Sequence, residues 1–253
     1  AVVTSDPAAN LQQSINDAIR DGAKELIVPD GDYYFHNRTL LVENAQGLTI
    51  RAASSATLWF WGWQGGVRIH RATDVRFQGF ILDRNPTPYI RGTVTAASKD
   101  TWTYSVAEDS LTTLPDFWSV GSNSSESPIL WAFKGAFMDD ATKCMDSAFD
   151  ATQIQPLGNR AFMYPCGRCC GRVAVGDSLM VTVWLGYMLA ISNSTRVTTQ
   201  NVAIHASGYM AVAESDGFGA HVYRNVSVVP GKDRTISVNA DGIHSEDVEF
   251  GPL

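Results

Sequence analysis

The sequence predicts an all-β fold, a parallel β-helix with a short N-terminal helix and an inserted, disulfide-tied β-rich subdomain. Three observations lead to this fold class: a short strand pattern that recurs along the chain, a long break in that recurrence, and a cluster of cysteines inside the break. The repeat predicts the coils, the break predicts the insertion, and the cysteines predict its cross-links. A sandwich of loosely regular strands is the alternative.

Residues 7–22 predict one amphipathic helix, because apolar residues recur there at the spacing of a helical face and Gly22 suits the C-terminal stop. The stretch 25–35 then predicts a strand, a Pro-Asp-Gly turn and a second strand. From there the chain is expected to form short strands separated by turns. The apolar helix face consists of Leu11, Ile15, Ala18 and Ile19.

Five short segments share one pattern: Asn, Asp or Gly, then an apolar residue, any residue and a second apolar residue. The first two segments lie 27 residues apart and the last three lie 24 and 22 apart, a length that suits one three-strand coil of a parallel β-helix. Asn and Asp suit a tight bend because they tolerate left-handed backbone angles, and alternate apolar residues face a shared core. The segments are Gly47–Ile50, Asp74–Phe77, Asn201–Ile204, Asn225–Val228 and Asp247–Phe250.

Between Asp83 and Asp177 this pattern is absent. Segments there alternate polar and apolar residues, as antiparallel strands do, and predict a separate subdomain. The segments are 92–96, 102–106 and 178–183. We therefore expect three regions: 1–90 with the cap helix and the first coils, 91–183 as the inserted β-rich subdomain, and 184–253 with the coils that carry the site.

All four cysteines lie in this inserted region, three of them within five residues. Two disulfides suit a secreted chain whose subdomain has a small core of its own. Zinc is the alternative because Cys-x-x-Cys is a ligand spacing, although two of the cysteines are adjacent and no histidine lies near them. The pairing is left open. The residues are Cys144, Cys166, Cys169 and Cys170.

The net charge of −7 at pH 7 argues against a nucleic-acid partner, because a phosphate-binding face needs clustered Lys and Arg. No stretch approaches the roughly 18 apolar residues of a membrane span. The chain opens without an initiator Met or a signal peptide, as a mature secreted, extracellular protein would. Four Asn-x-Ser/Thr sequons agree with export and predict glycosylation at Asn37, Asn123, Asn193 and Asn225.

The stretch 237–245 carries the densest group of functional side chains and directly continues an apolar strand. Asn239, Asp241 and His244 lie within six residues, and Gly242 lets the backbone turn among them. Polar groups that leave water lose free energy unless they are paired. The cluster therefore predicts an exposed cleft, and a turn with an incidental histidine is the alternative.

The repeats, the opening helix with its Val28–Tyr33 turn, and this cluster resemble the pectin-lyase-like superfamily of right-handed parallel β-helices. Asn239-Ala-Asp-Gly242 resembles the Asn-x-Asp-Gly motif of polygalacturonase-type glycoside hydrolases, and the segment through Ser245 resembles the β-helical α-1,3-galactosidase type. The resemblance implies a right-handed β-helix and hydrolysis of a galactose- or galacturonate-containing glycan. It also implies that Asp241 is one of the catalytic carboxylates.

The chain departs from both hydrolase types at its C-terminus. They place an Asp-Asp pair about one coil after the first Asp, whereas this sequence stops at Leu253 and has its only such pair at Asp139-Asp140, in the insertion. An open end of a β-helix exposes unpaired strand edges. We therefore expect the missing C-terminal coils in a longer parent chain, a second polypeptide or a swapped subunit.

A second carboxylate is needed for inverting hydrolysis, about 6.5–9.5 Å from the first. Neighbouring coils are about 4.8 Å apart, so Glu214 and Asp216, one coil before Asp241, are the candidates, with Glu214 preferred because it ends a strand as Asp241 does. A turn carboxylate that faces solvent is the alternative for each. Asn239 is expected to contact the sugar.

Two histidines and an aromatic stripe are the other expected contacts to the sugar. His205 and His244 follow equivalent strands and can bind hydroxyl groups, although His205 can equally be structural. Trp59 and Trp61 alternate along one strand with Trp63, so their indole rings face one side. They form either a platform for sugar stacking or a stripe of the core.

The predicted function is a secreted, inverting glycoside hydrolase that needs no cofactor or metal and binds a polysaccharide or oligosaccharide, with no nucleic-acid or membrane partner. Calcium-dependent lyase chemistry is a second class, which needs an acidic calcium cage and a basic residue. The candidate site residues include no acidic cluster of the kind that binds calcium and no arginine or lysine. A non-catalytic glycan-binding or structural β-helix is a third.

Overall fold

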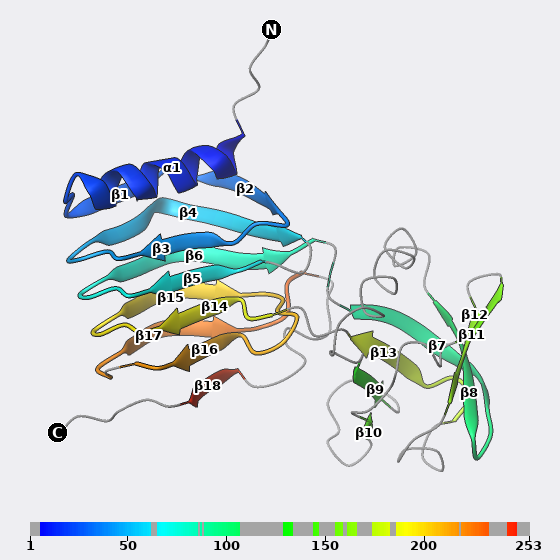
Figure 1. Ribbon diagram of the computed structural model, residues 1–253. Helices are drawn as coiled ribbons and strands as arrows, with labels where there is room; N and C mark the ends of the chain where they lie inside the picture. The colour runs from blue at the N-terminus through cyan, green and yellow to red at the C-terminus, as the bar shows by residue number, and fades with distance from the viewer. Residues whose placement is uncertain are drawn as a thin grey trace, which may run out of the picture. The chain divides into compact units, whose positions relative to one another are not determined.

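The structure, a computed structural model, divides into two compact units. One unit holds Ala1–Asn85 and Leu185–Leu253, and the other holds Pro86–Trp184. The first is a parallel β-solenoid of about 5 turns, of the right-handed type, with a short N-terminal helix (Figure 1). This confirms the predicted parallel β-helix. The residues described are 6–61, 65–85, 87, 89–106, 129–133, 144–146, 155–158, 161–165, 174–182, 186–217, 219–232 and 242–246.

Helix α1 (Pro7–Arg20) lies across the first end of the solenoid (Figure 1). Asp6 begins the helix, because its carboxylate accepts hydrogen bonds from two backbone N–H groups of the first turn at 3.0 and 3.3 Å. Gly22, with φ at 65°, follows its end. The predicted apolar face is confirmed and seals the core at this end. Its buried residues are Ala8, Leu11, Ile15 and Ala18.

Two parallel sheets form the solenoid. Sheet A has the strand order β1-β4-β6-β15-β17, with β2 also paired to β4, and sheet B has the order β3-β5-β14-β16-β18. The bounds in sheet A are β1 (Glu25–Val28), β2 (Gly31–His36), β4 (Thr49–Trp61), β6 (Arg76–Arg84), β15 (Thr198–Ile204) and β17 (Val222–Val228). The bounds in sheet B are β3 (Leu40–Glu43), β5 (Val67–His70), β14 (Leu189–Ser192), β16 (Val212–Ser215) and β18 (Ile243–Glu246).

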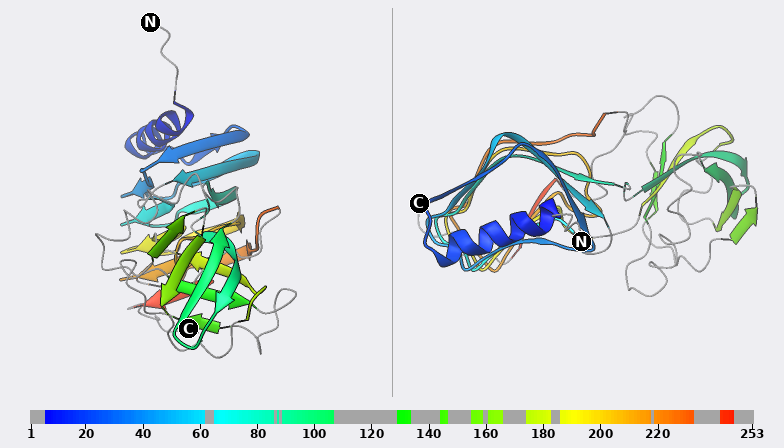
Figure 2. Two further views of the ribbon diagram at one scale, coloured as in Figure 1. Left: turned by 90° about the vertical axis from the view of Figure 1, so that its right-hand side faces the viewer. Right: turned by 90° about the horizontal axis from the view of Figure 1, so that it is seen from above.

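The coils are three-sided because the long strands of sheet A bend within their length, as the view from above in Figure 2 shows. Strand β4 pairs with β1 through Thr49–Ala52 and with β2 through Ala56–Trp61, and its register shifts between the two parts. The predicted strand pair at 25–35 is therefore present, but both strands run parallel to β4 and do not form a hairpin. Sheet B supplies the third side.

Apolar residues that alternate along each strand face the inside of the coils and form one core. In β3 and β5, Leu40, Val42, Val67 and Ile69 are at most 1% exposed, while the residues between them are more exposed. The core cluster runs without a break from α1 to β16. Burial of this surface is the main force that holds the stacked coils together.

The turn that leads from sheet B into sheet A contains two stacks of residues with left-handed backbone angles. At the corner between β6 and its upstream strand, Asp74 (φ 56°) stacks on Arg196 (φ 54°). Their side chains form a two-armed ion pair at 2.6 and 2.7 Å, although they are 122 residues apart. Within sheet A, Asn225 donates a side-chain hydrogen bond to Asn201 at 2.9 Å. The second stack in this turn consists of Asn44, Arg71, Asn193 and Asp216.

One alignment within the predicted repeat is wrong. The sequence pattern equates Asp74–Phe77 with Asn201–Ile204, whereas in the sheet Ala203 and Ile204 pair with Ile81 and Leu82. Asn201 is thus the counterpart of Gly79, and both have positive φ angles. The error arises because two different corners use Asn, Asp or Gly for the same backbone reason. The segment Asp247–Phe250 lies outside the described residues.

The second unit contains an antiparallel sheet with the order β10-β9-β13-β7-β8-β12-β11. This confirms the predicted antiparallel strands at 92–96, 102–106 and 178–183. The cysteine side chains lie outside the described residues, so the disulfides stay a prediction. The bounds are β7 (Tyr89–Ala97), β8 (Thr101–Val106), β9 (Ile129–Phe133), β10 (Cys144–Asp146), β11 (Gln155–Gly158), β12 (Ala161–Pro165) and β13 (Ser178–Thr182).

Candidate functional site

The outer surface of sheet B presents two columns of side chains, because every second residue of each strand points away from the core. One column contains a cation and an imidazole separated by two alanines. The other is mostly polar, and His70 Nδ1 lies 2.9 Å from Ser192 Oγ. The first column is Leu41, Arg68, Ala190, Ala213 and His244, and the second includes Glu43, His70, Ser192 and Ser215.

The small residues in the middle of both columns leave a hollow of about 350 Å³ on this surface. Ser192 and Ala213 form part of its floor and are 8% and 7% exposed. Arg68 lines it toward β3, His244 lines it at β18, and Tyr187 borders it beside the strand starts. The hollow thus offers a cation, an imidazole and an aromatic ring around a floor without bulky side chains.

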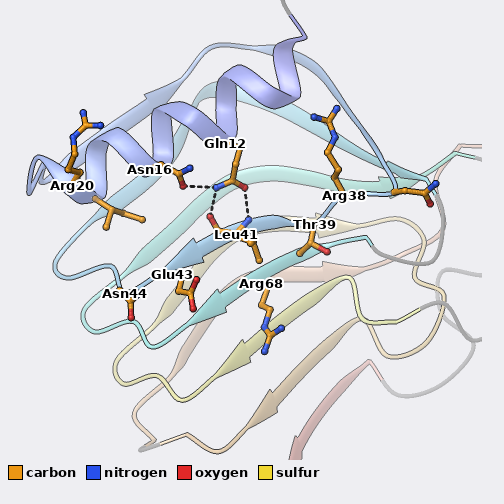
Figure 3. A pocket seen from close by; sticks show the side chains of 11 residues that line it. Gln12, Asn16, Arg20, Arg38, Thr39, Leu41, Glu43, Asn44 and Arg68 are labelled. Atoms are coloured by element: carbon orange, nitrogen blue, oxygen red, sulfur yellow. Dashed lines mark hydrogen bonds between the residues drawn. The ribbon is translucent and has the colours of Figure 1, made fainter.

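A larger hollow of about 910 Å³ continues toward α1 and shares Thr39 and Arg68 with the first. Its wall is fixed because the Gln12 side chain bonds both the N–H and the C=O of Leu41, at 2.8 and 2.9 Å (Figure 3). The two hollows together form a groove that crosses sheet B from α1 to β18. We call it the sheet B groove. Amide, carboxylate and arginine side chains line its upper part.

Arg68 is the cation in this groove that is available to a ligand. Arg38 pairs with Asp6, and Arg20 with Asp17 and Asp21. Arg68, in contrast, forms no ion pair with any other described residue and is exposed. Since a guanidinium forms two parallel hydrogen bonds to a carboxylate, Arg68 suits an anionic group on the ligand.

The predicted motif reaches the groove through His244. Strand β18 pairs with β16 so that His244 lies beside Ala213, and the carbonyl of Gly242 accepts a hydrogen bond from Val212 N–H at 3.0 Å. The chain directly after Asp241 is therefore held against β16. Asn239 and Asp241 themselves lie outside the described residues.

The two other predicted carboxylates point in different directions. Glu214 pairs with Ile191, which pairs with Ile69, so the side chains of all three point into the interior of the coils. Glu214 is 7% exposed. Its carboxylate contacts the hydroxyl groups of Tyr223 and Ser245. Asp216 is exposed at a corner with φ at 49°. Of this pair, Asp216 has its side chain at the solvent-exposed surface.

The remaining predicted contacts lie together on a different face, the outer side of the second part of sheet A. Trp59 and Trp61 point outward, and Trp61 is 48% exposed, so the structure excludes the alternative that these two form a core stripe. Trp59 stacks on Tyr34 at 6.2 Å between ring centroids and donates its indole N–H to Asp32 at 2.7 Å. Trp63 lies outside the described residues.

His205 belongs to the same face as these tryptophans, because Asp83 lies beside Trp59 in one neighbouring coil and beside His205 in the other. The Asp83 carboxylate, 3% exposed, lies 3.7 Å from His205 Nδ1. Sequence reasoning missed Asp83 because only the register between β6 and β15 brings the two residues together. It also missed Arg68, although the alternation of Val67, Arg68 and Ile69 marks it as an outward-facing residue.

The predicted glycosylation sites are exposed where the structure describes them. Asn37, Asn193 and Asn225 lie at left-handed positions with φ of 50°, 49° and 50°, and Asn123 lies outside the described residues. No helix in the described part of the chain is long and apolar enough to cross a membrane. Nor do the described residues bring together three or more His, Cys, Asp or Glu side chains that could hold a metal ion.

No family model matches the sequence, and no curated protein matches it.

Proposed function

We propose that the protein is a secreted glycoside hydrolase that binds a galacturonate- or galactose-containing glycan along the sheet B groove. The observation that carries this proposal is the register of β18, since His244, three residues after Asp241, lines the same hollow as Arg68. Asp241 acts as one catalytic carboxylate in this proposal, and the second comes from the further coils that complete the solenoid, because Asp216 lies beyond the opposite end of β16 from the residues that pair near Gly242. Inverting hydrolysis requires about 6.5–9.5 Å between the two catalytic carboxylates.

The groove supports an acidic glycan over a neutral one. Arg68 stands between the upper and lower hollows, so it can bind the carboxylate of a uronate while the chain continues on either side. His244 donates to or accepts from a sugar hydroxyl beside the floor. In the same proposal the protein is a distant member of the pectin-lyase-like superfamily, its insertion carries two disulfides, and a further polypeptide or swapped subunit completes its coils.

The test is turnover of homogalacturonan fragments and of α-galactosides by the purified protein, read by NMR of the anomeric protons. Asp241→Asn should lower kcat by about 10²–10⁴-fold with little change in KM, because it removes proton transfer and keeps the shape of the side chain. Arg68→Ala should raise KM for acidic fragments by roughly 10- to 100-fold and leave neutral galactosides unaffected. Full turnover by Asp241→Asn would refute the assignment.

Arg20→Ala is the matched control for Arg68→Ala. Arg20 also lines the upper hollow, but Asp17 and Asp21 already neutralise it at 2.6 and 2.9 Å. Its removal should therefore leave KM for acidic fragments nearly unchanged. An equal rise in KM for both variants would mean that general charge, rather than Arg68 in the groove, attracts the glycan.

A non-catalytic glycan-binding β-helix is the second candidate function, and one observation favours it. Glu214, the preferred second carboxylate in the sequence, also borders the lower hollow, but its carboxylate lies inside the coil, where Tyr223 and Ser245 hold it. A protein of this kind would bind acidic fragments in an Arg68-dependent manner and release no product. Calorimetry beside the turnover assay separates the two functions, since Asp241→Asn would then change neither binding nor product.

A further inference from the structure

The interior of the solenoid changes from apolar to polar at its last described coils. In sheet B one inward column runs from Ile69 through Ile191 to Glu214 and Ser245. In sheet A the facing column runs from Phe77 through Thr199 to Tyr223. The polar ends of both columns meet inside the coil that precedes β18.

Glu214 stands at the centre of this polar group and joins three strands. One carboxylate oxygen accepts a hydrogen bond from the Tyr223 hydroxyl of β17, and the other accepts one from Ser245 Oγ of β18 at 2.9 Å. Burial and the hydrogen bond to Glu214 both raise the pKa of Tyr223, so its phenol keeps the proton that it donates. Hydrogen bonds to a charged acceptor of this kind are stronger than neutral ones.

Strand β18 has few other contacts to hold it. Within the described residues it pairs with β16 alone. Its inward-facing Ile243 is 50% exposed, so that side chain contributes only part of the burial that a core residue provides. The bond from Ser245 to Glu214 is therefore a large share of what fixes β18 beyond its backbone ladder.

We propose that Glu214 is a positioning residue, an interior clamp that ties β18 to β16 and β17 and so fixes His244 in the sheet B groove. In this proposal the Glu214 carboxylate acts on the groove through its hydrogen bond with Ser245 and not by contact with the glycan. The effect on substrate rests on the proposed function, whereas the clamp itself does not. The clamp also gives a reason for a carboxylate at a position where the two preceding coils have Ile69 and Ile191.

Hydrogen–deuterium exchange of the backbone amides of β18, measured on the full chain without any ligand, tests the clamp. Ser245→Ala and Glu214→Ala should each lower the protection of these amides by at least tenfold. Glu214→Gln should retain it, because its amide can accept from Tyr223 and donate to Ser245 Oγ. Protection of β3, at the far end of sheet B, should stay unchanged in all three variants and serves as the internal reference.

Two outcomes would contradict this proposal, the first for the clamp and the second for the role of Glu214 as a positioning residue. Unchanged β18 protection in Ser245→Ala, which alters an exposed edge strand and should fold, would show that the bond does not hold β18. A Glu214→Gln protein that keeps protection but loses turnover would make Glu214 a catalytic residue. Failure of the hydrolase proposal leaves the exchange result intact, since the exchange measurement involves no substrate.

Discussion

The hydrogen bond that His221 accepts from the backbone of Val197 favours the neutral form of its imidazole ring. Its Nδ1 accepts the backbone N–H of Val197 at 3.1 Å, so the neutral ring has its proton on Nε2. Burial lowers the pKa of His221 below its ordinary value of 6.5, and the nearby charge of Glu214 partly offsets this shift. A proton added at Nδ1 would break the bond to Val197.

The stability of the solenoid should therefore depend on pH through His221. Because the pKa of His221 is lower in the folded state, the unfolded chain binds more protons as the pH falls below 6.5. The contribution of the neutral histidine is complete above pH 6.5 and is lost as the pH falls toward the folded-state pKa. His221→Asn keeps an acceptor for Val197 but cannot titrate, so its free energy of unfolding should fall less over this range.

Urea denaturation at a series of pH values on both sides of 6.5 measures this difference. Parallel pH curves for the wild type and His221→Asn would contradict the prediction.

Gly217 packs closely against His221, because a Cβ at position 217 would lie 3.2 Å from His221 Nε2. A glycine at this position lets the imidazole pack against the corner.

At the residue scale, the sequence singles out candidate polar side chains but does not predict where they point. His244 and Asp241 stand out because a carboxylate, an amide and an imidazole cluster within six residues. Glu214 was chosen because it ends a strand one coil before Asp241, yet its register turns its side chain inward, and the short pattern around it does not encode the register. Arg68 was missed because it is a lone cation between two apolar residues, and Asp83 was missed because only the register between β6 and β15 brings it near His205.

Among the structural elements, the bend inside the long strands of sheet A depends on residues that accept a left-handed backbone. Gly79, Asn201 and Asn225 occupy this bend in successive coils, with φ of 81°, 51° and 50°. Asn201 and Asn225 also share a side-chain hydrogen bond at 2.9 Å. The side-chain ladder and the backbone angle are therefore two separable contributions to the bend.

Asn201→Ala should lower the free energy of unfolding by about 1–2 kcal/mol, because alanine is strained at positive φ and the ladder bond is lost. Asn201→Gly is the matched control, because it loses the same hydrogen bond without the strain. Glycine already occupies the equivalent position in the neighbouring coil, at Gly79. Thermal and urea unfolding should rank the wild type first, Asn201→Gly second and Asn201→Ala last. An alanine variant as stable as the glycine variant would mean that the angle carries no strain.

The helix and the coil length were predictable from local chemistry, whereas the corner identities were not. The spacing of its apolar residues, its N-cap residue and the residues at its end define α1 without contacts from the rest of the fold. In contrast, Asn, Asp and Gly occur at each kind of corner, so a four-residue pattern cannot tell one corner from another. Pairing between β6 and β15 decides the alignment, and that pairing spans the insertion.

For the whole molecule, the core of the solenoid is independent of the inserted unit. The core cluster contains residues before Asn85 and after Leu185, and no described residue of 86–184 belongs to it. Strands β5 and β6 pair directly with β14 and β15 across the insertion. The coils before and after the insertion thus stack as if the chain were continuous.

Replacement of residues 86–184 by a short Gly/Ser linker should therefore leave a folded solenoid. We expect one cooperative thermal transition and a β-type circular dichroism spectrum. Asn201→Ala should cost the shortened protein the same free energy as the full chain, because independent sites add. A shortened protein that binds hydrophobic dyes and melts without a transition would show that the insertion supports the core.

The insertion also separates in time the synthesis of the coils that stack on each other. Asp74 and Arg196 touch in the finished molecule but leave the ribosome 122 residues apart. At about 5–20 residues per second, this delay lasts roughly 6–24 s. During that time the edges of β5 and β6 carry unpaired backbone groups, which are a template for a neighbouring nascent chain. Slower translation through the insertion lengthens this exposure, so chaperones that cover strand edges should raise the yield of this protein.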